Sequence, residues 1–428
     1  MSLSPTSLAR LVGAERLLVV TDFDGTLAGL STDIYGVPVN ADALAALTRL
    51  AGLPDTHVAV LSGRHLAGLR QVCHLQPPVV FAGSHGSESA EHGVTLTPAQ
   101  EEALAHLDEA LVFRHPLVHV ERKPFQRVVH TAPIAATDQA TADAILEKAL
   151  LIDAPGARVS RGKNIVEFSV SDVTKGTWLA AEIDRVAPDV AVFIGDDTTD
   201  EDGFRILRPG DVSVKVGAGE TAAAERVADI PAVADLLTRL ADARSAHLGI
   251  PRDVVGRFEA VAAGFTAEVL RVTDWDAATP CEGWAASDIV NHLLTWYPAN
   301  LRNADIDLEV TGDTPTTRWF SFVAAVRELL HDERATATFH SGPDEGSTVT
   351  QATTAFLLPD IFMHTWDLAR SQGHDVTLDP DYAARNLAGL QSLGGALQET
   401  GQFGPPLTPP ADASPGEQLM AYVGREVR

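Results

Sequence analysis

Two aspartates, Asp22 and Asp24, stand one residue apart just after the apolar run at residues 17–20. A charge at the end of a buried strand is costly unless another group pairs with it. One explanation is a turn, because Asp-Gly pairs form turns and aspartate caps helices. The other is a reaction centre. Alternation along a strand would point both carboxylates to one side, where one can attack as a nucleophile and the other can transfer a proton.

Four further features favour the reaction centre because they supply what phosphoryl transfer requires. They are Ser62 in the segment 61–64, Lys175 before a glycine, the glycine-rich turn at 82–88 and the acidic run at 194–202. A hydroxyl and a lysine can neutralise a phosphoryl group, and carboxylates facing a phosphate need a hard cation such as Mg²⁺ between them. Taken singly, each feature has a plainer explanation, since Ser-Gly pairs form turns and acidic runs are commonly solvated surfaces.

In this order the motifs resemble those of the haloacid dehalogenase superfamily of phosphatases. The segments DFDGTLAGL, VAVLSGRHLAGLR, FAGSHGSE and GDDTTDED narrow the resemblance to trehalose-6-phosphate phosphatases, over roughly residues 15–242. The resemblance implies that Asp22 is the nucleophile and forms an aspartyl-phosphate. It also implies that Asp24 acts as general acid and base, and that Ser62 and Lys175 bind the phosphoryl group.

The same resemblance implies a metal site and a sugar site. The Mg²⁺ ligands would be Asp22, the backbone carbonyl of Asp24, Asp196 and, directly or through water, Asp197. The substrate-binding residues would be Arg64, His85, Glu121, Lys123, Arg161, Lys163 and Glu167. The chain departs from the family at Ala132, where relatives commonly carry an arginine two positions after His130. That departure leaves a phosphatase for another sugar phosphate as an alternative.

A second group of polar residues occurs near the C-terminal end. Asp360 and His364 are four residues apart and therefore share one face of the helix expected there, while His292 belongs to an earlier helix. Two ligands on one helix and a third on another can hold a divalent metal. The alternative is that these histidines are partly buried and hydrogen-bonded. Cys281 is interpreted as a small buried residue in a turn.

The segments TPCEGWAASDIVNHL and MHTWDLARSQG resemble DinB-like helical bundles related to mycothiol-dependent maleylpyruvate isomerase, over most of residues 251–400. This resemblance implies a metal site at His292, Asp360 and His364, filled by Zn²⁺ or Ni²⁺, and a low-molecular-weight thiol as a partner. Relatives often carry glutamate or histidine at the position of Asp360.

The elements that must position these residues follow from the pattern of apolar positions. In the first half, strand-like runs alternate with helical periodicity, which predicts an α/β fold with a Rossmann-like parallel sheet. Residues 108–175 read as a small α+β cap inserted into that core, which comprises about 1–107 and 176–245. The strongly helical remainder predicts an all-α four-helix bundle. The expected domains are therefore 1–245 and 251–428.

Composition narrows the function classes. The 32 Lys and Arg residues against 58 Asp and Glu give a net charge of −26, which disfavours nucleic acid or an anionic membrane as a partner. Two cysteines make a disulfide framework unexpected. The N-terminal residues lack the pattern of a secretory signal, and no apolar run approaches the ~20 residues of a spanning helix. These features favour a cytoplasmic protein.

The expected function is Mg²⁺-dependent hydrolysis of trehalose 6-phosphate to trehalose and phosphate, in trehalose biosynthesis. One rival is a phosphatase acting on another sugar phosphate. Another is a metal- and thiol-dependent transferase or isomerase whose main activity resides in the helical half. A third is that the helical half serves only as an interaction module.

Overall fold

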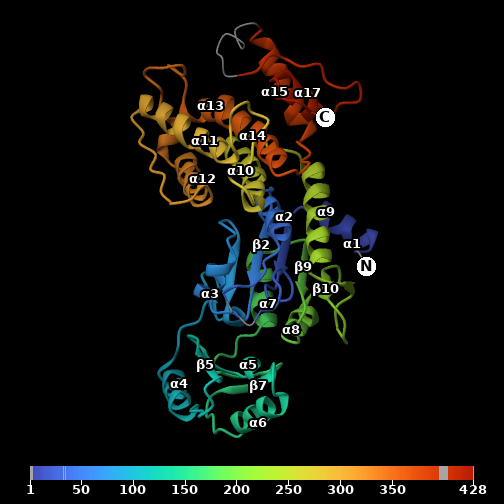
Figure 1. Ribbon diagram of the computed structural model, residues 1–428, viewed down its shortest axis with the longest axis vertical. Helices are drawn as coiled ribbons and strands as arrows, with labels where there is room; N and C mark the ends of the chain where they lie inside the picture. Colours follow the sequence, from blue (N-terminus) through green and yellow to red (C-terminus); the bar gives the residue numbers. More distant parts are fainter. Residues whose placement is uncertain (1–2, 32, 34, 395–402, 428) are drawn as a thin grey trace. The chain divides into compact units, whose positions relative to one another are not determined.

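The chain divides into two compact units in this computed structural model, which describes residues 3–31, 33, 35–394 and 403–427. The first unit comprises Met1–Asn40 and His57–Leu236, and the second comprises Ala41–Thr56 and Leu237–Arg428. Figure 1 traces both along the chain, from blue to red. The domain limits expected from the sequence remain predictions.

The core of the first unit is a seven-stranded sheet. In spatial order its strands are β11 (Glu225–Val227), β10 (Val212–Val216), β9 (Val190–Gly195), β1 (Leu17–Thr21), β2 (Thr56–Leu61), β3 (Val80–Gly83) and β4 (Glu88–Ser89). The pairs β1–β9, β9–β10, β10–β11 and β2–β3 are parallel, whereas β4 runs antiparallel to β3. The predicted α/β core with a parallel sheet is therefore confirmed.

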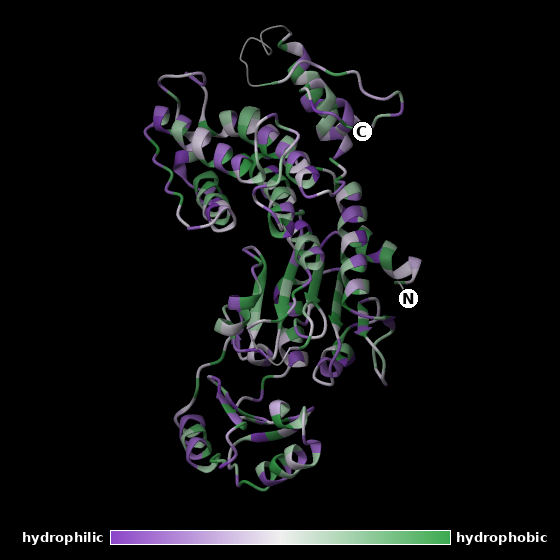
Figure 2. Cartoon of the chain, in the orientation of Figure 1, coloured by the Kyte–Doolittle hydropathy of each residue, from purple (hydrophilic) through white to green (hydrophobic). Residues whose placement is uncertain are grey.

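The central strands are buried along their length. Every residue of β1, β9 and β10 is buried, and Figure 2 shows the central strands of the sheet largely in the green of hydrophobic residues. One face packs against α7 (Lys175–Val186) and α8 (Asp200–Ile206) through a shared apolar cluster that includes Trp178 and Phe193. Strands covered in this way read as continuous aliphatic runs, which is why the sequence pattern identified them. The remaining short helices of this core are α1 (Pro5–Gly13), α3 (Leu66–Val72) and the 3₁₀ turn η1 (Ser84–Gly86).

A second, four-stranded antiparallel sheet forms the cap. In spatial order its strands are β5 (His119–Arg122), β6 (Gln126–His130), β8 (Ile165–Ser169) and β7 (Arg158–Gly162), and its helices are α4 (Pro98–Ala110), α5 (Ala132–Ala135) and α6 (Gln139–Leu150). Val129, Val166 and Phe168 pack against α4 and α6. One face of this sheet is thus covered by helices, and the other face carries polar side chains. The edge strand β7 is exposed at every position.

The second unit is helical. Its helices are α2 (Ala41–Ala51), most of α9 (Ile230–Leu248), α10 (Val254–Arg271), α11 (Ala286–Leu301), α12 (Pro315–His331), α13 (Val349–Ala352), α14 (Leu358–Ser371), α15 (Pro380–Ser392) and α17 (Pro415–Tyr422), with shorter turns at η2 (Arg302–Ala304), η3 (Glu333–Thr336) and the π-helical η4 (Thr353–Leu357). Helix α10 packs against α2, α12 and α14 around one large apolar core. The specific arrangement as a four-helix bundle stays a prediction. Among the described residues, no helix has the length and apolar character needed to cross a bilayer.

Candidate active site

The residues predicted to do chemistry gather at one edge of the core sheet. Asp22 follows β1 directly, Ser62 follows β2, and Asp196 follows β9, and these three strands are neighbours. Carboxyl ends of parallel strands lie at the same sheet edge, where open α/β proteins place their sites. Figure 1 labels three of the elements at whose ends these residues stand, namely strands β2 and β9 and helix α7.

Lys175 is a buried cation that contacts two buried carboxylates. Thr174 caps α7 by accepting from the backbone N–H of Thr177, so Lys175 is the first residue of that helix. Its Nζ donates to Asp22 Oδ1 at 2.9 Å and to Asp200 Oδ1 at 2.7 Å. Burial alone lowers the pKa of Lys175, but the two carboxylates raise it above its ordinary value. Lys175 therefore stays cationic and holds the side chain that is expected to attack.

The carboxylates outnumber the cation that they face. Oxygens of Asp22, Asp196 and Asp200 lie within 4.8 Å of one another. Burial, and then the charges of Asp200 and Asp196, raise the pKa of Asp22 well above its ordinary value, although Lys175 opposes this. The pKa of Asp196 is raised to about 6, mainly by burial and then by Asp200 and Asp197. The cluster therefore has an excess of negative charge that a bound cation would relieve.

Asp196 supplies a further sign that a cation fits here. Its Oδ1 is buried and has no hydrogen-bond partner among the described residues. Gly25 allows this carboxylate to come close: a Cβ at that position would lie 2.2 Å from Asp196 Oδ2, and its φ of 77° also favours glycine. Three oxygen donors with an unpartnered lone pair match what Mg²⁺ requires.

The structure brings Asp200, not named from the sequence, into this cluster in the position expected of Asp197. Asp200 is fully buried, and its Oδ2 accepts from the backbone N–H of Asp197 at 2.8 Å. The carboxylate of Asp197 is exposed and accepts from the N–H of Thr198 at 2.7 Å. The four-residue spacing between Asp196 and Asp200 was the available signal within the acidic run.

Asp24 lies outside the carboxylate cluster and is paired with Arg64. The guanidinium donates from Nε to Oδ2 and from Nη2 to Oδ1 of Asp24, both at 2.7 Å. Ser62 is fully buried, and its Oγ accepts from the backbone N–H of Arg64 at 3.1 Å. Arg64 thus links the end of β2 to Asp24, the residue expected to transfer the proton.

The polar face of the cap carries three of the predicted substrate residues. Strand pairing aligns Glu121 with Val128 and Val128 with Glu167, so both glutamates lie on one face of the sheet, and Lys123, two positions from Glu121, shares it. Glu167 lies 3.5 Å from His85 of the core, and Lys123 Nζ donates to the carbonyl of Gly63 at 2.9 Å. The cap and the core sheet therefore meet through these side chains.

Glu121 is held as an anion on this face. His130 Nε2 lies 2.9 Å from Glu121 Oε2, and Lys123 Nζ lies 3.8 Å from it. Burial raises the pKa of Glu121, but His130 and Lys123 outweigh it and lower the pKa to about 2. The pKa of Glu167 is likewise lowered, because the hydrogen bond and charge of His85 outweigh burial. His130 was not among the substrate-binding residues predicted from the sequence.

Two predicted substrate residues are not on this face. Arg161 pairs in register with Val166, which packs against α6, and its guanidinium forms ion pairs with Asp143 and Glu147 of that helix. Lys163 stands in the turn between β7 and β8 and is exposed. Arg158 shares the face of Glu167 instead and helps lower the pKa of that glutamate. No sequence signal distinguished Arg158 from Arg161, because the register of the hairpin decides the face.

The second unit brings its three predicted residues together. Asp360 of α14 lies 3.1 Å from His292 Nε2 of α11 and 3.4 Å from His364 Nε2 of its own helix. Trp296 Nε1 also donates to Asp360 at 2.8 Å. Burial lowers the pKa of His364, but Asp360 and then Asp367 raise it to about 10. One ligand atom from each of the three predicted residues lies within 4.8 Å of the others.

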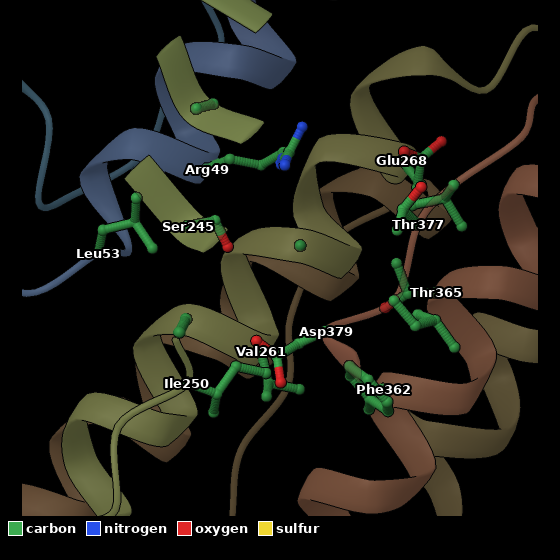
Figure 3. Close-up of a pocket in the computed structure, with 15 residues that line it drawn as sticks. Arg49, Leu53, Ser245, Ile250, Val261, Glu268, Phe362, Thr365, Thr377 and Asp379 are labelled. Atoms are coloured by element: carbon green, nitrogen blue, oxygen red, sulfur yellow. The ribbon is translucent and has the colours of Figure 1, made fainter. Parts of the chain in front are cut away.

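A cavity in the second unit is separate from this group. Figure 3 shows Arg49, Ser245, Glu268, Thr377 and Asp379 around it, with apolar side chains of α10 and α14. The residues that line it include neither His292 nor His364.

The matches to known proteins fall mainly on the first unit. The trehalose-phosphatase family model matches residues 20–230. The trehalose-6-phosphate phosphatase of Escherichia coli (strain K12) is 32% identical over 225 residues, which cover 50% of this chain and 82% of that protein. The trehalose-phosphate phosphatase of Mycobacterium ulcerans is 36% identical over 220 residues, covering 48% of this chain.

The chain belongs to the trehalose-phosphatase family. It spans 55% of the length of the Mycobacterium ulcerans relative. Among solved structures, the C-terminal domain of the Candida albicans trehalose-6-phosphate phosphatase aligns with a TM-score of 0.46 and 21% identity, over 56% of this chain and 98% of that one.

Proposed function

We propose that the first unit hydrolyses trehalose 6-phosphate to trehalose and inorganic phosphate, as a step of trehalose biosynthesis. The observation that carries the proposal is the buried arrangement of Asp22, Lys175, Asp196 and Asp200 at the carboxyl edge of the sheet, in a chain of the trehalose-phosphatase family. This arrangement offers a nucleophile held by a cation, next to oxygen ligands for a divalent metal.

The reaction would proceed in two displacements. An oxygen of Asp22 attacks the phosphorus, the bond from phosphorus to the sugar oxygen breaks, and Asp24 donates a proton to that oxygen. Asp24 then takes a proton from water as the water attacks the phosphorus of the aspartyl-phosphate, which releases phosphate and restores Asp22. Lys175 and Ser62 neutralise the phosphoryl oxygens in both steps.

Mg²⁺ fits the first site by the chemistry of its donors. Asp22, Asp196, the backbone carbonyl of Asp24 and either Asp200 or, through water, Asp197 would hold it. When bound, it would supply charge neutralisation for the phosphoryl group. The unpartnered Oδ1 of Asp196 supports this assignment.

Arg64 has to move during the reaction. Asp24 accepts a hydrogen bond from Arg64 on each of its two oxygens, so in this arrangement both oxygens face the guanidinium and not a leaving group. We infer that substrate binding draws Arg64 to the phosphorylated sugar, which frees Asp24 to act as an acid. Arg64 therefore belongs with the substrate-binding residues.

The polar face of the cap would bind the sugar. Several sugar hydroxyls can be hydrogen-bonded there by Glu121, Lys123, Glu167 and His85. Any contact of Arg161 or Lys163 with the sugar would come from outside this face. Closure of the cap through Lys123 and Gly63 also excludes water before the acyl-phosphate forms. Ala132 keeps another sugar phosphate as the alternative substrate.

The test is phosphate release by the full chain from a panel of sugar phosphates with Mg²⁺. Trehalose 6-phosphate should be hydrolysed with the highest kcat/KM, chelation should stop turnover, and added Mg²⁺ should restore it. Asp22→Asn should lower turnover by several orders of magnitude because an amide cannot form the acyl-phosphate. Asp202→Asn, in the exposed part of the same acidic run, is the matched control.

Retention of more than about a tenth of phosphate release by Asp22→Asn would refute the role of this residue, given the size of the covalent contribution. A preference for another sugar phosphate would identify the alternative substrate.

We propose a second candidate function for the helical unit: binding of Zn²⁺ or Ni²⁺ by His292, Asp360 and His364, in a site that accepts a low-molecular-weight thiol. The proximity of the three ligand atoms supports it, since a three-ligand site leaves a position for a reactant. Metal analysis of the full chain tests it, with His364→Ala as the variant that should lose the metal. A folded, metal-free wild type after growth with added metal would make the helical unit an interaction module.

A further inference from the structure

The two ring nitrogens of His364 face different groups. Nε2 faces Asp360 and the ring of His292, whose centroid lies 5.3 Å from that of His364. Nδ1 lies 3.0 Å from Asp367 Oδ2 on the other side. His364 therefore belongs to two possible ligand sets, one with His292 and Asp360 and the other with Cys281 and Asp367.

A cationic side chain, Arg425, already lies against the second set. Arg425 donates from Nε to Asp367 Oδ1 at 3.2 Å, from Nη2 to Asp367 Oδ2 at 3.2 Å, and from Nη2 to Cys281 Sγ at 2.9 Å. A divalent metal among Cys281, His364 and Asp367 would lie against this guanidinium and be repelled by it. The second set is therefore unsuited to a metal, whereas Asp360 of the first set accepts its hydrogen bonds from His292 and Trp296.

Asp367 is held by three side chains. It is fully buried and accepts from His364, from Arg425 and from Cys281 Sγ, which lies 3.2 Å from its Oδ2. A carboxylate can only accept, so the nitrogen of His364 that faces it must carry a proton. A metal that binds at Nε2 takes the place of a proton there, while the proton on Nδ1 can stay because Asp367 accepts it.

We propose that Asp367 is a positioning residue that keeps the proton of His364 on Nδ1 and so presents the lone pair of Nε2 to a metal held with His292 and Asp360. Arg425 and Cys281 fix Asp367 in this role. The inference rests on the proposed metal site of the helical unit. It assigns Cys281 to the support of a ligand and gives it no part as a nucleophile or as a ligand itself.

The test measures the Zn²⁺ affinity of the full chain by competition with a chromophoric chelator. Asp367→Asn should lower the affinity about 10- to 100-fold, the range found when such outer partners are removed. Asp276→Asn, an exposed aspartate of the same unit, is the control and should bind as the wild type does. Cys281→Ser keeps a donor to Asp367 and should stay within about twofold of the wild type.

Two spectroscopic measurements separate positioning from a general loss of structure. With Co²⁺ in place of Zn²⁺, the wild type should show no thiolate-to-metal charge-transfer band. NMR spectra of the Zn²⁺-loaded protein with ¹⁵N-labelled histidine give the second measurement. The signals of His364 are identified as those that the wild type shows and His364→Ala lacks. They should show that Nδ1 is protonated in the wild type. Asp367→Asn should lose this preference for Nδ1. If that variant does not fold, Arg425→Gln replaces it and should weaken Zn²⁺ binding several-fold.

The outcomes are distinct. A wild type that binds no metal refutes the proposed second function, and with it the basis of this inference. If Asp367→Asn, or Arg425→Gln in its place, binds Zn²⁺ as tightly as a tightly binding wild type, the positioning role of Asp367 is refuted. The proposed metal site itself would then still stand. A thiolate band that disappears in Cys281→Ser would show that the metal occupies the second set, and this also overturns the proposal.

Discussion

At the scale of single residues, the acidic run after β9 shows how burial assigns different tasks to neighbouring carboxylates. Asp200 is enclosed between the ammonium of Lys175 and the backbone of Asp197, while Asp197 points to solvent. A buried carboxylate with two donors organises the site, whereas an exposed one capping a turn contributes little.

We therefore expect Asp200→Asn to be more damaging than Asp197→Asn. Loss of the charge leaves Lys175 with one carboxylate partner and should lower the free energy of unfolding by about 1–3 kcal/mol. Mg²⁺ at 100 times its Kd should raise the stability of the wild type by about 2.7 kcal/mol, and this gain should shrink in Asp200→Asn. Urea unfolding with and without Mg²⁺ measures both effects. Equal losses in Asp197→Asn would restore Asp197 as the ligand.

Glu121 provides a prediction about pH. Its pKa falls from 4.5 to about 2 on folding, so the folded state binds fewer protons than the unfolded state in this range. The stabilisation is complete above pH 4.5 and is lost as the pH falls toward 2. The free energy of unfolding should thus exceed that of Glu121→Gln by up to about 3 kcal/mol at neutral pH, and the difference should narrow below pH 4.5.

Urea unfolding at several pH values checks this, with the exposed Glu102→Gln as control. A difference between wild type and Glu121→Gln that does not change down to pH 3 would contradict the ion pairs with His130 and Lys123.

The sequence predicted the placement of some of these residues better than that of others, for a physical reason. Four of these residues stand next to the end of a strand or helix: Asp22, Ser62, Lys175 and Asp196. Parallel pairing of the strands then places them at one edge of the sheet, whatever the conformation of the loops. Asp200 depended on how one short turn folds. The four-residue spacing of Asp196 and Asp200 was a signal that both lie near one site, but it did not predict the contact of Asp200 with Lys175.

At the scale of elements, the cap sheet separates side chains that the sequence grouped together. A register shift of one residue exchanges the two faces of a strand, and sequence periodicity does not fix the register of a polar hairpin. Glu167 faces His85, whereas Arg161 faces α6. The alternation of strands and helices, by contrast, was enough to predict the parallel core sheet, because its strands are buried on both faces.

This difference gives a matched pair of variants. Glu167→Gln should lower kcat/KM for trehalose 6-phosphate by at least about tenfold, since a charged hydrogen bond to a hydroxyl is worth about 1.5–3 kcal/mol. It should change turnover of a small aryl phosphate much less, because that ester does not reach the cap. Arg161→Ala, on the other face, should leave both substrates nearly unchanged. Phosphate release measured with both substrates decides the matter, and a larger loss in Arg161→Ala would reverse the assigned faces.

At the scale of the whole molecule, the two proposed metal sites differ in their donor atoms and belong to separate compact units. The first site offers only oxygens and suits Mg²⁺, whereas the second includes two imidazoles and suits Zn²⁺ or Ni²⁺. Different ligand chemistry should keep the two metals in their own sites.

We therefore expect the two sites to fail independently. His364→Ala should remove the transition metal from the full chain and leave phosphate release unchanged. Asp22→Asn should abolish phosphate release and leave the Zn²⁺ or Ni²⁺ content unchanged. Elemental analysis and a phosphate assay on the same preparations measure both quantities. A variant that lowered both would show that the two units are coupled.

The exposed edge strand β7 has a consequence for behaviour in concentrated solution. A strand with a free edge can recruit the same strand of another copy, which is a common route to aggregation. In β7, Arg158 and Arg161 lie on opposite faces, so each face of this strand carries a charged side chain. Charged side chains on an edge strand oppose pairing with another copy and should protect the cap from strand addition. Engineering of the sugar-binding face should therefore keep a positive charge on each side of β7, or the protein will lose solubility before it gains a new specificity.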